Sequence, residues 1–242
     1  MTLGGHLPRA FLIFFPKNDD DPIELYNKGI DHLERGKFRE SLKIFDKTLT
    51  IDPNLTPAWI NKGGVLAKLG RHQDALEAYE KALTIDPINI DAWFNKGNAF
   101  NNLGQYDNAI KAFDKVLALA PTHSGAWNNR GSALIDLGKH QEALESIDAA
   151  LSCNPNNDNA WANKGIILIN LIRFQEAFEA IDSALKINSN NDVAWNTKGA
   201  ILQKTGNYKE ALEAYNKALT INPHYAVARR NKDLVTKLIR KR

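Results

Sequence analysis

The chain has 242 residues, of which 43% are hydrophobic and 24% are charged, as in ordinary folded proteins. Its net charge of +3 is too small to mark the whole chain as a nucleic-acid binder. The longest apolar run, residues 10–15, is too short to cross a bilayer, and the lone Cys153 excludes an intrachain disulfide framework. We therefore expect a cytoplasmic protein that does not enter a membrane.

Residues 1–21 form an N-terminal extension with the apolar segment Ala10–Phe15. Pro16, Lys17 and three aspartates follow this segment, so it lacks the small-residue cleavage site of a secretory signal. We hypothesise that residues 10–15 pack on a helix face or in a groove, of the same chain or of a second copy. Self-association through this segment is one expectation, and a leader without a structural role is the alternative.

From residue 22 onward the chain repeats every 34 residues, a period typical of stacked helical hairpins. All five tryptophans follow this spacing: Trp59, Trp93, Trp127, Trp161 and Trp195. The period divides the chain into six blocks, whose positions we number as slots 1 to 34. The blocks are residues 22–55, 56–89, 90–123, 124–157, 158–191 and 192–225.

Within each block the slots predict two helices and two breaks. Apolar residues recur at helical spacing over slots 1–14 and 18–31. Glycine at slot 15 suits the left-handed residue that ends a first helix, and proline at slot 32 follows the second helix. Slot 8 is always glycine, although a glycine in mid-helix costs about 1 kcal/mol relative to alanine. Its recurrence predicts that the two helices approach closely there, with the small residues of slots 20 and 27 facing it.

Tryptophan at slot 4, glycine at slot 8, alanine at slots 20 and 27, a large apolar residue at slot 24 and proline at slot 32 resemble the tetratricopeptide repeat. The resemblance covers residues 22–225. It implies an all-α, right-handed superhelical solenoid of six 34-residue helix-turn-helix repeats, with the first helices lining the concave side. Three departures are Ile172 for the slot 15 glycine, Ser189 for the proline, and Arg229 where a seventh tryptophan would fall.

Residues 226–242 are expected to form a capping helix, to about Arg240, with a basic tail. From Arg229 to the end the chain has seven basic residues and one acidic residue. Basic residues near a helix C-terminus are favoured by the helix dipole, which is the simpler interpretation of this tail. A nucleic-acid surface is the less favoured alternative.

The sequence offers no recognisable catalytic chemistry. Its histidines and Cys153 are not at metal-ligand spacing, and no phosphate-binding glycine motif is present. We therefore expect no enzyme activity, cofactor, metal site or small-molecule substrate. The tryptophans are interpreted as core residues rather than base-stacking platforms, because all of them occupy one slot.

By the resemblance, slots 2, 5, 9, 12 and 13 of the first helices face the concave groove. These slots are apolar near the N-terminus and rich in amides further along, which favours a peptide or protein segment as ligand. The candidate groove residues are Tyr26, Ile30, Ile60, Phe94, Asn98, Asn101, Asn102, Asn128 and Asn196.

Slots 6 and 7 each have a structural and a functional interpretation. Slot 6 holds Asn27, Asn61, Asn95, Asn129 and Asn163. These resemble the asparagine ladder of O-linked N-acetylglucosamine transferases, which implies pairing with a peptide backbone; bonds to neighbouring helices are an equal alternative. Slot 7 is basic in every block, and we favour long side chains covering the repeat junctions over a positive stripe for acidic partners.

The main functional hypothesis is a non-catalytic scaffold that binds a peptide or protein segment in the concave groove. The first alternative is a recruitment or regulatory arm of an enzyme or secretion complex, acting through its ends or convex face. A nucleic-acid-associated protein that uses the basic tail is a third, less favoured hypothesis.

Overall fold

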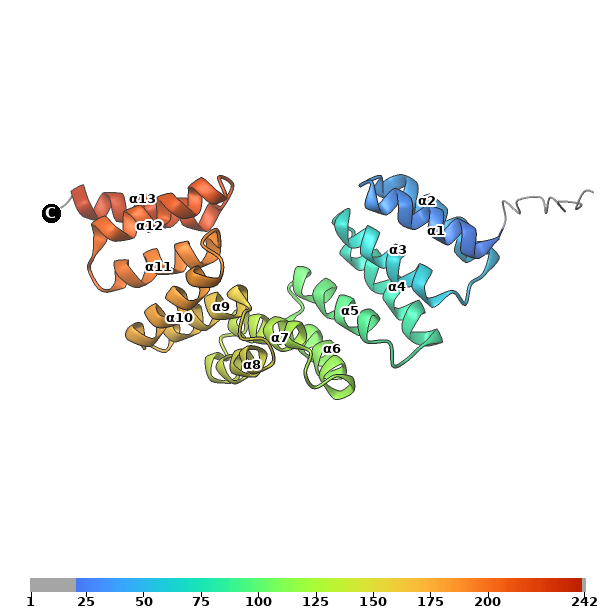
Figure 1. The fold of residues 1–242 in the computed structure, drawn as a ribbon, viewed down its shortest axis with the longest axis horizontal. Helices are drawn as coiled ribbons and strands as arrows, with labels where there is room; N and C mark the ends of the chain where they lie inside the picture. Colours follow the sequence, from blue (N-terminus) through green and yellow to red (C-terminus); the bar gives the residue numbers. More distant parts are fainter. Residues whose placement is uncertain (1–20, 241–242) are drawn as a thin grey trace, which may run out of the picture.

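The computed structural model describes residues 21–240, and within this range it contains thirteen α-helices and no strand (Figure 1). The first helices of the repeats are α1 (Pro22–Glu34), α3 (Thr56–Lys68), α5 (Ile90–Asn102), α7 (Ser124–Asp136), α9 (Asp158–Asn170) and α11 (Asp192–Lys204). The second helices are α2 (Phe38–Ile51), α4 (His72–Ile85), α6 (Tyr106–Leu119), α8 (His140–Cys153), α10 (Phe174–Ile187) and α12 (Tyr208–Ile221). The helix α13 (Ala226–Arg240) ends the array. The hypothesis about residues 10–15 lies outside the described residues.

Each first helix spans slots 1 to 13 and each second helix spans slots 17 to 30, so both end one residue earlier than the pattern predicts. The turn between them contains the expected left-handed residue at slot 15. Its φ is +70° at Gly36 and +86° at Gly206. Ile172 adopts the same conformation with φ +62°, although it lacks the freedom of glycine.

The close approach predicted at the slot 8 glycines is confirmed. A Cβ placed on Gly97 would lie 2.6 Å from Cε1 of Phe113, and one on Gly131 would lie 2.6 Å from Cδ1 of Ile147. The closest contact is therefore made by the fully buried slot 24 side chain. Of the small residues that we expected, slot 20 is also near, with the Ala143 carbonyl oxygen 3.4 Å from a Cβ on Gly131, whereas no slot 27 residue is among the nearest atoms. Glycine is required because the slot 24 side chain of the same repeat occupies the space of its missing Cβ.

The curvature follows from which helices touch. Consecutive first helices contact one another, and each second helix contacts the first helix of the next repeat, whereas no two second helices of the described chain are in contact. The row of first helices is thus the shorter side of the array. Figure 1 shows the resulting arc, with α5, α7 and α9 toward its inside and α6, α8 and α10 on its outside. The chain is an all-α superhelical repeat protein.

The last helix, α13, caps the array by packing on α11 and α12. Its Ala228 and Val235 are fully buried, and Ile239 packs against the cluster around Tyr215. Arg229 takes the place of a seventh tryptophan, and its guanidinium donates a hydrogen bond of 2.6 Å to the carbonyl oxygen of Pro223. This side chain thus makes the same contact as the tryptophans of the preceding repeats, described next.

Candidate functional site

The tryptophans join consecutive repeats. Each indole Nε1–H donates to the slot 32 carbonyl oxygen of the preceding repeat, over 2.8 to 2.9 Å. The pairs are Trp59 with Pro53, Trp93 with Pro87, Trp127 with Pro121, Trp161 with Pro155 and Trp195 with Ser189. The rings are only half-buried, so they are junction residues at the edge of the core rather than its centre.

The slot 7 cations complete the same junctions. Five of them pair with a slot 25 carboxylate of the preceding repeat: Lys62 with Asp46, Lys96 with Glu80, Arg130 with Asp114, Lys164 with Asp148 and Lys198 with Asp182. Each also lies over the ring of its own repeat's tryptophan, as Lys62 does at 4.9 Å. The structural interpretation of slot 7 is therefore confirmed at these five positions, where the charge is neutralised within the chain.

The floor of the concave side is formed by slots 5, 9 and 12 of the first helices, most of which are half-buried. At its N-terminal end this floor is apolar, and its aromatic side chains pack on buried aromatic rings of the second helices. The ring of Tyr26 lies 6.0 Å from that of Phe45, and the ring of Phe94 lies 6.0 Å from that of Phe113. Phe94 also packs on the His123 imidazole at 4.9 Å. The predicted apolar residues Tyr26, Ile30, Ile60 and Phe94 thus share one surface, each with part of its side chain open to solvent.

The predicted amides form a second zone, and many of them bond to one another. In slot 6, Asn61 donates to the Tyr26 hydroxyl at 2.9 Å, Asn129 donates to Oδ1 of Asn98 at 2.8 Å, and Asn163 donates to Oδ1 of Asn128 at 3.0 Å. These bonds connect α3 to α1, α7 to α5 and α9 to α7. They correspond to the structural alternative for slot 6, although each amide oxygen has capacity to accept another bond. Asn27 and Asn95 have no side-chain hydrogen bond to the described residues.

The remaining candidate amides differ in accessibility. Asn102 is exposed at slot 13, on the rim of the groove, and Asn101 places its Oδ1 below the surface without a described hydrogen-bond partner. Asn196 is only 8% exposed, because α13 covers it and Asn231 donates to its Oδ1 at 3.2 Å. The expectation that Asn196 faces an open groove is therefore wrong. The sequence contained the signal, since Asn231 occupies the position that slot 6 would have in a seventh block.

Charge is distributed unevenly across the concave side. None of the residues at slots 5, 9 and 12 of the six repeats is charged. The charged groove residues lie at the outer slots, where they are exposed and form a charged rim: Asp91 at slot 2, and Glu34, Lys68, Asp136 and Lys204 at slot 13. Partial burial of the Asp136 carboxyl raises its pKa above the ordinary value. A ligand on the floor thus meets aliphatic, aromatic and amide groups, and meets charge only at the edge.

The sequence reasoning missed a set of helix caps at slot 34. Asn89, Asn157 and Asn191 each accept the backbone N–H of a buried alanine three residues later, at 2.8 to 3.1 Å. His123 does the same through Nδ1, at 3.0 Å from Ala126 N. These residues cap the N-termini of the first helices. His123, which caps α7, also packs its imidazole against the Phe94 ring. The available signal was a polar residue one position before every first helix except α3, which follows Leu55.

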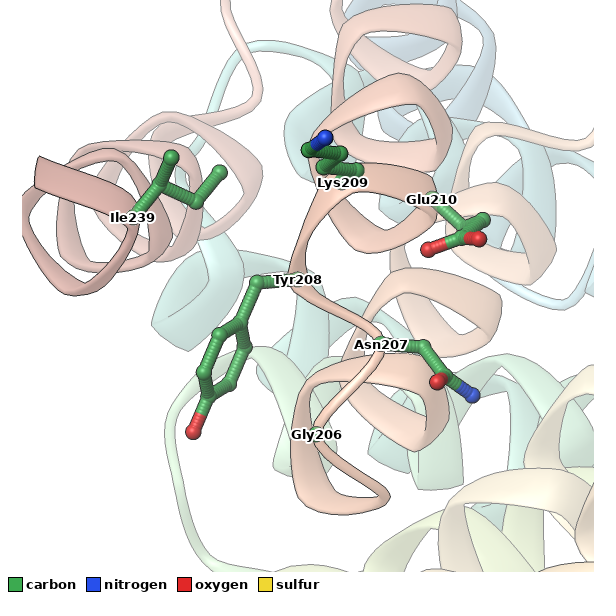
Figure 2. Close-up of a pocket in the computed structure, with 6 residues that line it drawn as sticks. All are labelled: Gly206, Asn207, Tyr208, Lys209, Glu210 and Ile239. Carbon is green, nitrogen blue, oxygen red and sulfur yellow. The ribbon is translucent and has the colours of Figure 1, made fainter. Parts of the chain in front are cut away.

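A cavity of about 310 Å³ lies near the C-terminal end, between α13 and the turn that precedes α12. Figure 2 shows Ile239 and Tyr208 on one side of it, while Asn207 and Glu210 point another way. The side chains do not converge on a common point, as a small-molecule site would require. Among residues 21–240 there is no group of three or more metal-ligating side chains, and no helix there has the length and hydropathy of a membrane span.

Several solved structures share this fold. The chain aligns with a chain of the APC/C hetero-tetramer Cut9–Hcn1 at a TM-score of 0.78 and 21% identity, covering 90% of this chain and 43% of that one. It aligns with YrrB, a tetratricopeptide-repeat protein with an unusual peptide-binding site, at 0.58 and 24% identity, covering 78% and 97%. Pseudomonas aeruginosa PilF gives 0.72 and 19% identity, covering 86% and 95%. At such identities the likeness establishes the fold and not the ligand. None of the curated proteins gives a significant match.

Paired helices at a 34-residue period, with a tryptophan at each junction and a glycine under each slot 24 side chain, define a tetratricopeptide-repeat protein. The family model of the C-terminal domain of cilia and flagella-associated protein 70, a tetratricopeptide-repeat domain, matches residues 31–236. The chain belongs to this family. The solved structures share its all-α superhelical repeat fold.

Proposed function

We propose that the protein is a non-catalytic scaffold whose concave groove binds an uncharged peptide or protein segment. The observation that carries this proposal is the absence of charge from the groove floor, in a chain of which 24% of residues are charged. The floor instead offers the Tyr26, Ile60 and Phe94 side chains for apolar contacts. The amides around Asn98 and Asn128 then supply donors and acceptors that suit a peptide backbone.

The chemistry of the floor leads to a specific expectation about salt. Binding to uncharged groups is not screened by counterions, whereas ion pairs at a surface weaken at high ionic strength. Capture of the partner is therefore expected to be unchanged between about 0.1 and 1 M salt, over which the screening length falls from ~10 to ~3 Å. A strong loss of capture at high salt would place the binding surface on the charged rim, the ends or the convex side.

The test is capture of partners from native extract by the intact protein and by groove variants. Phe94→Asp places a charge on the floor and is expected to abolish capture, and Ser132→Arg does the same from the fourth repeat. The control is Ile88→Asp, which changes an apolar residue that is 69% exposed in a loop between repeats. Partners that the groove variants retain, with the fold verified by circular dichroism, would contradict groove binding. They would favour a recruitment arm that acts through its ends or convex face.

A further inference from the structure

The exposed face of α13 carries a line of aliphatic side chains. Val227, Leu234 and Leu238 are 44%, 47% and 38% exposed. Their spacing of seven and four residues places them on one stripe of the helix. This stripe continues the concave side past the sixth repeat, because the three residues correspond to slots 2, 9 and 13.

These side chains are not the ones that attach α13 to the array. Attachment uses the adjacent face, about 100° around the helix, where Ala228 and Val235 are buried and Ile239 packs against the core. Arg229 adds a hydrogen bond to Pro223, and Asn231, which lies beside Val227 and Leu234, adds one to Asn196. The end of a repeat array needs a polar outer surface for solubility. Exposed leucines at slots 9 and 13 work against that requirement, so capping alone does not account for them.

Two cations, Arg230 and Lys237, lie along one side of the stripe. Arg230 and Lys237 are exposed, and neither forms an ion pair with a described residue. The cations at slot 7 of the second to sixth repeats, by contrast, are all neutralised by a carboxylate of the preceding repeat. The only acidic residue of α13, Asp233, lies four residues from Lys237, in a helix with five basic residues.

We propose that this face of α13 binds an amphipathic helical segment of a partner protein, one that carries acidic side chains beside aliphatic ones. The partner's aliphatic side chains would cover Val227, Leu234 and Leu238. Its carboxylates would pair with Arg230 and Lys237, where burial of the neighbouring apolar surface reduces screening. The site is separate from the uncharged groove floor and does not depend on the function proposed for that floor.

The probe is a labelled synthetic peptide of about 16 residues, long enough for several helical turns, with leucines at i, i+3, i+4 and i+7 and glutamates elsewhere. Binding to the full chain is followed by fluorescence anisotropy. A second peptide has lysine in place of every glutamate and is expected to bind at least tenfold more weakly. The interaction with the acidic peptide is also expected to weaken with salt, unlike capture in the groove.

The site variant is Leu234→Glu with Leu238→Glu, which is expected to weaken binding of the acidic peptide at least tenfold. The matched control, Gln141→Glu with Ser152→Glu on the exposed side of α8, adds the same charge and is expected to bind as the unaltered chain does. Phe94→Asp is also expected to leave this binding unchanged, which separates the α13 site from the groove. Equal binding by site variant and control, equal binding of the two peptides, or displacement of the acidic peptide by single-stranded poly-U would overturn the proposal.

Discussion

Gly63 and Gly64 are neighbours in α3, yet they meet different surroundings. A Cβ on Gly63 would lie 2.8 Å from Cδ1 of the buried Tyr79, whereas one on Gly64 meets nothing within 4 Å. Gly63→Ala is therefore expected to destabilise the protein by roughly 1–3 kcal/mol through overpacking. Gly64→Ala is expected to stabilise it by roughly 0.5–1 kcal/mol, because alanine restricts the helix backbone better than glycine. Urea unfolding of both variants measures the difference, and an equal effect would contradict the packing role of slot 8.

Ile172 is the only described non-glycine residue with a positive φ, and it is 75% exposed. The left-handed conformation costs an L-residue roughly 1–2 kcal/mol. Ile172→Gly is therefore expected to raise the free energy of unfolding by about 1 kcal/mol. Ile172→Val, which stays β-branched, is the control and is expected to have little effect. If the glycine variant were less stable, the isoleucine would have to make a favourable contact at this turn.

The buried Tyr79 hydroxyl makes the free energy of unfolding depend on pH in the alkaline range. Burial raises the pKa of its hydroxyl to about 12 from 10.0, so the folded state favours the protonated form. The associated stability is fully present below pH 10 and is lost as the pH rises toward 12, by roughly 2–3 kcal/mol. Tyr79→Phe removes this contribution, and its loss of stability between pH 9 and about 12 is expected to be smaller by that amount. Urea unfolding at each pH measures the free energy of unfolding. If it fell equally with pH in both proteins, the Tyr79 hydroxyl would not be the group responsible.

At the scale of the element, each junction between repeats combines a hydrogen bond and an ion pair of unequal value. Trp161→Phe removes a bond of 2.8 Å to the Pro155 carbonyl and part of the packed ring, and is expected to cost roughly 1–2 kcal/mol. Asp148→Asn breaks the pair with Lys164, in which the carboxylate is 50% exposed, and is expected to cost less than about 1 kcal/mol. Urea unfolding measures both losses of stability. A larger loss for Asp148→Asn than for Trp161→Phe would show that the ion pairs contribute more to the junctions than the tryptophans.

At the scale of the whole molecule, the contacts between helices of residues 21–240 are confined to neighbouring repeats. Deleting residues 226–242 uncovers the cluster around Tyr215 and frees Asn196. In an array with nearest-neighbour coupling, the loss is expected to stay local. Hydrogen exchange should accelerate in α11 and α12 and remain unchanged in α1 to α8. Acceleration along the entire array would instead indicate that the protein unfolds as one cooperative unit.

The 34-residue period by itself determined the helix pairs and the turn residues, and the family resemblance implied how the pairs stack. The period could do so because, in the described part of the chain, every contact between helices lies within one repeat or between adjacent ones. A local pattern therefore specifies the packing without long-range information. Even the irregular Ile172 adopts the turn conformation that its slot predicts.

Only the tertiary structure decided where the polar side chains of those slots make their bonds. Slot number alone could not show that Asn163 donates to Asn128, that Asp148 neutralises Lys164, or that α13 buries Asn196. Hydrogen bonds and ion pairs depend on ångström distances, and these are set by the rotation of each repeat against the next. Apolar packing tolerates small changes in that rotation, so a sequence period predicts the core well and the polar surface of a groove poorly.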